Sequence, residues 1–556
     1  MRKSNWQYLY FLVLLPCLIY TILYTARAVR LDYTAVPFWD SWRSVQYVDQ
    51  LLKFDLRHFW VQHNEHRIVF PEMVYALDYI FLRGLQLLPI ACNIACQLAQ
   101  LAILWRLLWR MNDMPPAFRL ALGAGAGLFM TTAMQVQGIL GTFELQWYLS
   151  QLAAAWALLF LCESASTGRW VSLAASIGAA IVATYSTSNG MVLWAVLVTM
   201  AALLRLPKAR LAVVAIAGML SIGAYFVGYS TMDHSRTATL IAHPFYAIWF
   251  AWVFLGTPVS YASARLGGVV GLSGLLLVAL ALTVAIRRRR LGDAVLAPTA
   301  GVCLYVAGSA LMIAYGRMEP GDAAVRAALP ARYVSVPLTY CANLTVLIGW
   351  LIIQLPRLRR LALHIAAAAL VMLVLAAVVR PQRAYERAFA SQQAHGHETG
   401  IALVAGIEDA DVIRAIFPDP SFVLAHLPAI RSKRLSIFAG RRQDWIGQQV
   451  NRLFRPASPS LCSGALETLS AVTGGYRVAG WVLERAADRR PRDIVLTDSA
   501  NVIAGFGETR PGSYDSDNRW VGFARAGGVS GTMQAYAIVQ SGKAACAVGS
   551  PQQYGN

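Results

Sequence analysis

The stretch from Trp6 to Ala26, WQYLYFLVLLPCLIYTILYTA, decides the fold class of this chain. It is about as long as the roughly 20 apolar residues with which a helix crosses a bilayer. A cleavable signal peptide ending near Ala28 is the alternative. Its apolar core would be roughly 7 to 15 residues long, and here the stretch is longer and many similar ones follow. We therefore predict a retained membrane-spanning helix.

Similar apolar runs recur through the first two thirds of the chain. With the first they make about eleven predicted spans, the others covering residues 85–105, 118–134, 146–162, 171–187, 189–204, 211–228, 267–286, 296–315, 333–355 and 361–379. Of the 556 residues, 57% are hydrophobic and 14% charged, a composition that excludes a water-soluble globule for most of the chain. The sequence thus predicts a polytopic α-helical membrane protein in contact with the lipid bilayer.

The formal charge of +19 follows membrane topology. Basic residues gather in short clusters such as Arg287–Arg290, and every second connection between spans carries one, which places these connections in the cytoplasm. By alternation the loop at residues 31–70, the loop at residues 229–265 and everything after Arg380 lie outside. In a bacterium this describes a multi-pass protein of the inner (cytoplasmic) membrane with a periplasmic C-terminus. No nucleic-acid partner is expected.

The composition changes after Arg380, so we predict three domains. Residues 1–380 form the transmembrane domain, residues 381–457 a helical stalk near the membrane surface, and residues 458–556 a small periplasmic β-sandwich of short alternating segments separated by Gly, Asp, Ser and Pro. Cys462 and Cys546 are the only cysteines after Arg380 and bracket most of the last domain. In an oxidising periplasm they suit a disulfide.

The loop after the first span, PFWDSWRSVQYVDQLLKFDLRHFWVQHNEHR at Pro37–Arg67, is rich in charged and aromatic residues. Ionisable groups held at a membrane face indicate a functional site. Asp40, which follows Trp39, and Glu65 near the end of the loop are the candidate catalytic acids, because a carboxylate there could take a proton from an acceptor hydroxyl. The alternative is that tryptophans such as Trp39 anchor the interface and the charges form a solvated face.

Further residues are candidates for substrate binding. His63, His66 and Arg67 would share one face if HNEHR were helical, and Trp39 could stack on a sugar ring. In YGRMEPGDAAVRAALPARYVSVPL (Tyr315–Leu338), Arg317, Arg332 and Tyr333 could hold a lipid-linked phosphate, the alternative being contact with lipid headgroups. His234 flanks a third external loop. Two polar external turns could line the same cavity, although each is more typical of a helix cap than of a ligand site; they contain Gln135, Gln137, Glu144, Gln146 and Trp147 in one, and Ser186, Ser188, Asn189 and Gly190 in the other.

Four motifs carry a family resemblance: FWDSW, HNEHRI, GYSTMDHS and HPFYAIWFAWVFLGTP. With them the chain resembles polytopic bacterial membrane glycosyltransferases of the GT-C superfamily. The resemblance implies a GT-C-like fold and inverting transfer of a sugar from a polyprenyl-phosphate donor to a periplasmic glycan, lipid or protein acceptor of the cell envelope, such as lipopolysaccharide. Asp40 matches the early loop acid of the family and Glu65 a second one.

The acidic EXD or DXD pair of some family members is absent, which leaves open which acid is the base and whether a divalent cation takes part. No metal ligands and no other cofactor are assigned.

Two other functions compete with this one. A transporter or flippase of lipid-linked saccharides would carry functional charges inside its spans, near the membrane midplane. An O-antigen polymerase would have its large catalytic loop late in the chain. Here the acids near apolar runs lie at the ends of these runs, and the loop rich in charged and aromatic residues follows the first span. The sequence also lacks GxxxxGK[ST], HExxH and paired CxxC motifs, which removes the simplest evidence for an ATP-driven pump or a zinc hydrolase.

Overall fold

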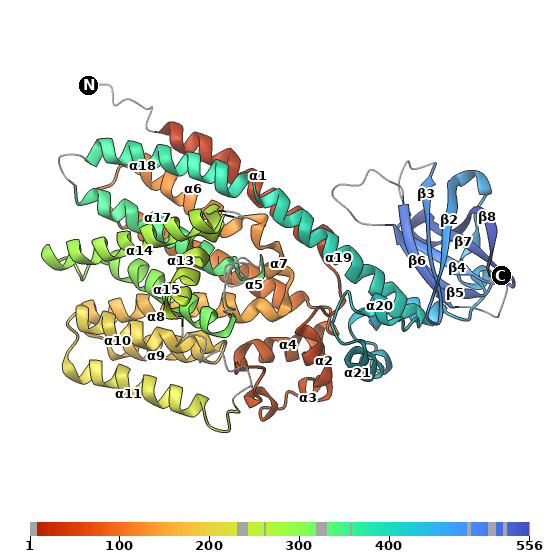
Figure 1. The fold of residues 1–556 in the computed structure, drawn as a ribbon, viewed down its shortest axis with the longest axis horizontal. Helices are drawn as coiled ribbons and strands as arrows, with labels where there is room; N and C mark the ends of the chain where they lie inside the picture. The colour runs from red at the N-terminus through yellow and green to blue at the C-terminus, as the bar shows by residue number, and fades with distance from the viewer. Residues whose placement is uncertain are drawn as a thin grey trace. The chain divides into compact units, whose positions relative to one another are not determined.

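The computed structural model describes residues 8–230, 243–260, 263–317, 331–355, 359–485, 491–509, 519–525 and 531–554. The chain divides into two compact units. The first unit comprises residues 1–27, 55–74 and 88–386, and the second comprises residues 28–54, 75–87 and 387–556 (Figure 1). The predicted external loop at residues 31–70 is therefore shared between the units, and its first half belongs with the C-terminal part of the chain.

The first unit is built of helices. Its elements are α1 (Leu9–Asp32), α4 (Val69–Leu82), α5 (Leu87–Trp109), α6 (Pro116–Thr131), α7 (Val136–Leu140), α8 (Leu145–Thr167), α9 (Trp170–Thr184), η5 (Ser188–Met191), α10 (Val192–Leu203), α11 (Lys208–Tyr225), α13 (Pro244–Ser260), α14 (Ala264–Arg287), α15 (Leu296–Arg317), α17 (Ser335–Ile353) and α18 (Arg359–Val374); the ends of α1 and α4 are assigned to the second unit.

Nine helices of the described chain are long and apolar enough to cross a membrane. Three further apolar helices, α9, α10 with η5, and α13, are shorter than the roughly 20 residues of a full span. Two of these occupy the predicted spans at residues 171–187 and 189–204. The third, α13, lies where the sequence predicted an external loop at residues 229–265.

Apolar side chains cover the outside of this unit as well as its core. Met219 and Leu220 on α11 and Val269 and Leu276 on α14 are each more than 60% exposed. Such surfaces are unstable in water but favourable against lipid tails. Because these helices also have the length and composition of membrane spans, the first unit is that of a multi-pass membrane protein.

Helices α13 and α14 pack as an antiparallel pair at close range. A Cβ atom at Gly256 would overlap the carbonyl oxygen of Gly267, and one at Gly271 would overlap that of Trp252. Small residues let two backbones approach in this way, which favours helix association in a membrane. The glycine spacing explains why the expected external loop contains a helix packed against the following span.

A break between α9 and α10 brings polar residues to one end of the bundle. The helix ends at Thr184, and η5 begins at Ser188. Gly190 lies so close to the end of α9 that a Cβ there would overlap the carbonyl group of Ala183. The Asn189 side chain donates to the carbonyl oxygen of Ser309 on α15 at 3.1 Å. These contacts hold η5 in place beside the cavity described below.

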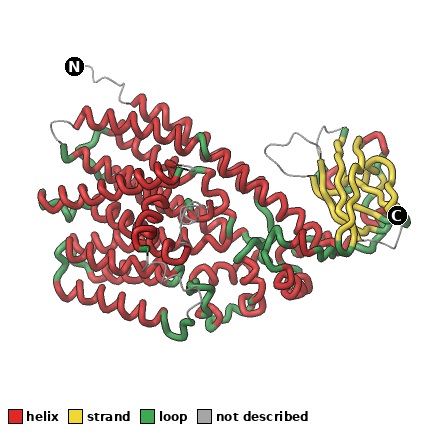
Figure 2. The backbone as a smooth tube through the Cα atoms, in the orientation of Figure 1, coloured by secondary structure: helices red, strands yellow, loops and turns green. Residues whose placement is uncertain are grey.

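The second unit combines helices with a β-sheet (Figure 2). Its elements are α2 (Ser41–Gln46), α3 (Val48–Leu52), α19 (Gln382–Ala405), α20 (Ala410–Ile413), α21 (Pro420–Ser432), α22 (Val450–Leu453), β1 (Arg455–Pro456), β2 (Cys462–Val472), β3 (Gly475–Glu484), β4 (Asp493–Thr497), β5 (Ile503–Thr509), β6 (Arg519–Arg525), β7 (Gly531–Val539) and β8 (Ala544–Tyr554).

The described strands form a single sheet of eight in the order β1-β8-β7-β4-β5-β6-β3-β2. The sheet curls until β2, at one edge, lies against β8: Gln552 Nε2 donates to the carbonyl oxygen of Leu466 at 2.5 Å. Cys462 and Cys546 are joined by a disulfide between the same two strands, which is the pair that the sequence predicted. The predicted two-sheet sandwich was wrong. A curled sheet covers its edges by itself, whereas alternation along strands cannot distinguish the two architectures.

Both faces of the sheet contribute buried side chains. On β6, Trp520 and Ala524 point into the interior of the curl, while Val521 and Phe523 point outward and pack with Ile401 of α19. Side chains alternate in this way because the strand has a period of two residues. Parts of the predicted stalk, from Ile401 to Ile407 and at Val450 and Phe454, thus belong to the same core as the β-domain.

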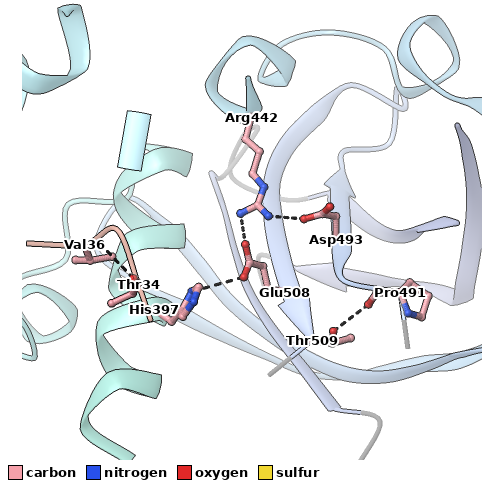
Figure 3. Close-up of polar contacts among 8 residues, drawn as sticks. All are labelled: Thr34, Val36, His397, Arg442, Pro491, Asp493, Glu508 and Thr509. Atoms are coloured by element: carbon pink, nitrogen blue, oxygen red, sulfur yellow. Dashed lines mark hydrogen bonds and ion pairs between the residues drawn. The ribbon is translucent and has the colours of Figure 1, made fainter. Parts of the chain in front are cut away.

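A cluster of charged residues links the sheet to its covering elements (Figure 3). Glu508, at the end of β5, pairs with Arg442 and lies 3.5 Å from Nδ1 of His397 on α19. Arg442 also pairs with Asp493 of β4. Glu508 is almost fully buried, so its charge depends on these partners.

Candidate functional site

The HNEHR motif is a tight turn and not a helix. The backbone N–H of His63 donates to the carbonyl oxygen of His66 at 2.7 Å, and the reverse bond is 2.9 Å long. Asn64 has a left-handed backbone (φ 50°), which a helix would not contain. As a result the two histidine side chains have different neighbours: His63 packs on Phe143 with ring centroids 4.6 Å apart, and His66 lies near Trp147.

Arg67 holds this turn against the end of α11. Its Nε donates to the carbonyl oxygen of Tyr225 at 2.7 Å and one terminal nitrogen donates to that of Val227 at 2.6 Å, while the other reaches the carbonyl oxygen of Trp60. Its own backbone N–H donates to the Tyr225 hydroxyl at 2.8 Å. With 2% of its surface exposed, Arg67 is a structural clamp rather than the substrate ligand that the sequence predicted.

The turn forms part of the wall of a cavity of about 340 Å³ within the first unit. Residues from six segments line it: Glu65 and His66 from the turn; Trp147 from α8; Ser188, Asn189 and Met191 from η5; Tyr225, Phe226 and Tyr229 from the end of α11; Met312, Ile313, Tyr315, Gly316 and Arg317 from α15; and Tyr333 from η6 (Ala331–Tyr333), just before α17. The cavity therefore unites one carboxylate, one imidazole and one guanidinium group within largely aromatic walls.

Glu65 is held in the cavity wall by its backbone. Its carbonyl oxygen accepts hydrogen bonds from the hydroxyl groups of Tyr225, at 3.2 Å, and Tyr229, at 3.3 Å. These two bonds fix the position of the residue and leave the side-chain carboxylate to line the cavity. A carboxylate positioned in this way has the chemistry of a general base.

His66 is held in one protonation state. Burial lowers its pKa to about 4, with nearby Arg317 acting in the same direction and Glu65 opposing it, so the imidazole is neutral near pH 7. The backbone N–H of Ser188 donates to Nδ1 at 3.4 Å, which makes Nδ1 an acceptor, and the Ser188 hydroxyl lies 2.8 Å from the same atom. The proton of the neutral ring therefore sits on Nε2, and His66 is a hydrogen-bond donor there.

The three residues predicted to hold a lipid-linked phosphate, Arg317, Arg332 and Tyr333, do not all line the cavity. Arg317, the last residue of α15, and Tyr333 both line the cavity. The ring of Tyr333 meets Trp147 edge to face at 5.5 Å. Arg332 instead lies over the Tyr333 ring, with its guanidinium carbon 4.8 Å from the centroid, and is not among the residues that line the cavity. The prediction that Arg332 binds substrate directly therefore has no support from its position.

The other first-loop candidates belong to the second unit. Asp40 precedes α2, and Trp39 has a left-handed backbone (φ 47°) whose N–H donates to the carbonyl oxygen of Ile416 at 2.9 Å. Neither residue is among the described residues that line the cavity of the first unit. His234 lies outside the described residues. Of the two candidate acids, Glu65 is thus the one found in the cavity.

Sequence reasoning identified some lining residues and missed others. The sequence left open whether the two polar turns share a cavity or only cap helices. Trp147, Ser188 and Asn189 do line the cavity, whereas the other residues of these turns are not among its described lining residues. The aromatic residues at the end of α11, Tyr225 and Tyr229, were missed. The signal that could have found them is a group of aromatic residues directly after the apolar run at residues 211–228.

No metal site is evident in the part of the chain that the structure describes, where no three His, Cys, Asp or Glu side chains lie close enough together to hold an ion. Comparison with known proteins found no matching family model, no matching curated protein and no matching solved structure. The likeness to GT-C enzymes therefore rests on the sequence motifs alone.

Proposed function

We propose that this protein is an integral-membrane glycosyltransferase of GT-C type, which moves a sugar from a polyprenyl-phosphate donor to a glycan, lipid or protein acceptor of the cell envelope. The observation that carries the proposal is that Glu65 and Arg317, from segments far apart in the sequence, line one cavity of the membrane unit. A carboxylate and a guanidinium are the two charged groups that such a transfer needs.

Five residues of the cavity have roles in this reaction. Glu65 takes the proton from the incoming hydroxyl, and the oxygen attacks the anomeric carbon as the bond to the phosphate breaks. Arg317 stabilises the departing polyprenyl phosphate by charge-assisted hydrogen bonds. His66 donates from Nε2 without adding charge, and Trp147 and Tyr333 provide aromatic surfaces for the sugar. A single displacement of this kind inverts the anomeric centre.

Asp40 remains the alternative base, as the family resemblance implies. The two acids are distinguished by their variants, because a base that is replaced by its amide loses proton transfer while keeping its shape.

The proposed setting is the inner membrane of a bacterium, with the cavity and the C-terminal domain on the periplasmic side. Two observations support it. Basic clusters on alternate connections favour a cytoplasmic location for those connections. The disulfide between Cys462 and Cys546 is typical of an oxidising compartment.

The test is donor turnover by the full-length protein in lipid nanodiscs. A panel of synthetic polyprenyl-phosphate sugars with a radiolabelled sugar is incubated with envelope extract as the acceptor. We expect labelled product and free polyprenyl phosphate in equal amounts from one donor of the panel. Movement of intact donor between leaflets without cleavage would instead identify a flippase, and the absence of both activities across the panel would contradict the proposal.

A further inference from the structure

We infer that the second unit carries a separate anion-binding site, which takes a phosphate group in a polar cavity at the C-terminal end of α19. The cavity has a volume of about 410 Å³. Its charged lining consists of Arg431, Arg434, Arg525 and Asp444. Three arginines and one aspartate leave a formal surplus of two positive charges, so the cavity attracts an anion.

The three guanidinium groups come from separate elements. Arg431 lies in the last turn of α21, Arg434 follows that helix in a left-handed conformation (φ 53°), and Arg525 ends β6. Convergence of long cationic side chains from different elements on one cavity is unfavourable by mutual repulsion unless a counter-charge is bound. Asp444 supplies one counter-charge through a bidentate pair with Arg434, at 2.8 and 3.0 Å.

Arg431 and Arg525 are held in position while most of their hydrogen-bonding capacity remains. Arg525 Nε donates to the carbonyl oxygen of Ala405 at 2.7 Å, and a terminal nitrogen of Arg431 donates to that of Leu403 at 3.1 Å. Within the described chain these are their only hydrogen bonds, so four of the five N–H groups of each arginine have no protein acceptor there. The Phe438 ring supports Arg431, with a guanidinium-to-centroid distance of 5.1 Å.

Gly406 makes room for this arrangement. It has a left-handed backbone (φ 79°), and a Cβ atom there would overlap the guanidinium group of Arg525. Because Gly406 has no Cβ, the Arg525 guanidinium can lie against its backbone, and the bond from Nε to Ala405 then sets the orientation of the group. The site is therefore preorganised, which lowers the cost of binding.

Phosphate is the anion that fits these donors. Planar guanidinium groups bind phosphate oxygens through paired N–H···O bonds, and two or more arginines often share one phosphate. The volume leaves space for a phosphate ester larger than the inorganic ion. Its source is either an anionic lipid headgroup or a soluble phosphate ester. The site uses no residue of the Glu65 cavity and does not depend on the proposed glycosyl transfer.

The competing explanation is that these arginines only neutralise the carbonyl end of α19, as cations at a helix C-terminus do. This accounts for the single hydrogen bonds of Arg431 and Arg525. It does not account for Arg434, whose side-chain hydrogen bonds in the described chain go to Asp444 and not to that helix end, and it predicts no effect of phosphate.

Binding is tested with the full-length protein in phosphatidylcholine nanodiscs. Thermal unfolding is followed during titration with inorganic phosphate, with chloride of equal ionic strength as the reference. We expect phosphate to raise the unfolding temperature of the wild-type protein and of the matched control Arg441→Gln, which removes a nearby exposed charge outside the cavity. Arg525→Gln and Arg434→Gln should each weaken apparent phosphate binding by roughly tenfold or more.

Failure of phosphate to stabilise the wild-type protein, or unchanged phosphate binding by both cavity variants, would overturn the site. Should Arg525→Gln not fold, Arg434→Gln decides alone, because Arg434 is exposed and its ion pair contributes little to stability.

A second set of nanodiscs containing phosphatidylglycerol separates the two sources. If the phosphate effect on the wild-type unfolding temperature is lost in these discs, the lipid headgroup occupies the site. Arg525→Gln, which weakens the site, should then remove the difference between the two lipids. An equal phosphate effect in both lipids assigns it to a soluble phosphate ester.

Discussion

His66 and Ser188 are joined by a hydrogen bond of 2.8 Å between Nδ1 and the hydroxyl oxygen, although 122 residues separate them in the chain. The bond ties the first-loop turn to η5, and the backbone N–H of Ser188, which donates to the same Nδ1, makes this nitrogen the acceptor. This arrangement makes His66 a neutral donor beside the only carboxylate, Glu65, among the described residues that line the cavity. The chemistry of the cavity depends on this pairing of loop and helix break.

Replacing Glu65 by glutamine should lower donor turnover by roughly 10² to 10⁴-fold, the range in which a positioned general base contributes. The amide keeps the shape of the side chain, and the backbone carbonyl still accepts the two tyrosine hydroxyl bonds. Turnover in nanodiscs is the measurement. Glu163→Gln is the control, because Glu163 is exposed at the end of α8 and does not line the cavity.

The same assay on Asp40→Asn decides between the two acids. Retained turnover in Asp40→Asn together with loss in Glu65→Gln assigns the base to Glu65. The opposite pattern would transfer the role to Asp40, and two active single variants with an active double variant would rule out a first-loop base.

Arg317→Ala should raise the apparent KM for the donor about tenfold or more with little effect on unfolding temperature, since a phosphate contact is lost from an exposed helix end. Arg317→Lys should recover part of the affinity, because the charge returns without the planar fork. Arg332→Ala should have a smaller effect, exerted through the Tyr333 ring that it covers. Arg169→Ala, at an exposed loop, is the control. Equal losses of affinity and stability in Arg317→Ala would identify a structural residue.

The stability of the first unit should decrease as the pH is lowered, because His66 becomes protonated on unfolding. Its folded pKa of about 4 lies below the ordinary value of 6.5, so the unfolded chain binds more protons between these values. The stabilisation from neutral His66 is complete above pH 6.5 and is lost as the pH falls toward 4, by at most about 3 kcal/mol. Unfolding temperatures of His66→Asn should therefore depend less on pH in this window than those of the wild-type protein or of the exposed-site control His395→Asn. Parallel curves for all three would contradict the assignment.

Cys462 and Cys546 should resist thiol reagents in the denatured, unreduced protein, while the six other cysteines, which are free thiols in the structure, should react. Peptide mapping after maleimide treatment measures this directly. Replacing both residues by serine should lower the stability of the curled sheet by up to about 4 to 5 kcal/mol by the chain-entropy estimate for a separation of 84 residues. Labelling of either cysteine before reduction would show that the bond does not form in the cell.

Glu508→Gln should destabilise the second unit by about 3 kcal/mol, because it leaves the Arg442 guanidinium without one of its two carboxylate partners in a largely buried position. Thermal unfolding reports the change. The matched control is Asp411→Asn, which breaks an exposed pair with Arg414 and should shift stability by less than about 1 kcal/mol. Similar effects of the two variants would mean that the Glu508 cluster is effectively solvated.

The sequence by itself determined that this is a membrane protein with a separate C-terminal β-region and one disulfide. These properties depend on local quantities: the length of apolar runs, the period of two along a strand, and the presence of only two cysteines after Arg380. The turn residues Glu65 and His66 were also recognisable, because charged groups next to a membrane span are costly unless they serve a function.

Tertiary structure alone decided which of these residues meet. HNEHR became a tight turn because Arg67 and Tyr225 hold it, not because of any helical preference of its own. The same clamp removed Arg67 from the substrate ligands, and the break before η5 brought Ser188 to His66. Closure of the sheet into a curl likewise depends on contacts between β2 and β8, which are distant in sequence. Such long-range contacts leave no periodic signal, so the sequence could indicate the elements but not the partners that position them.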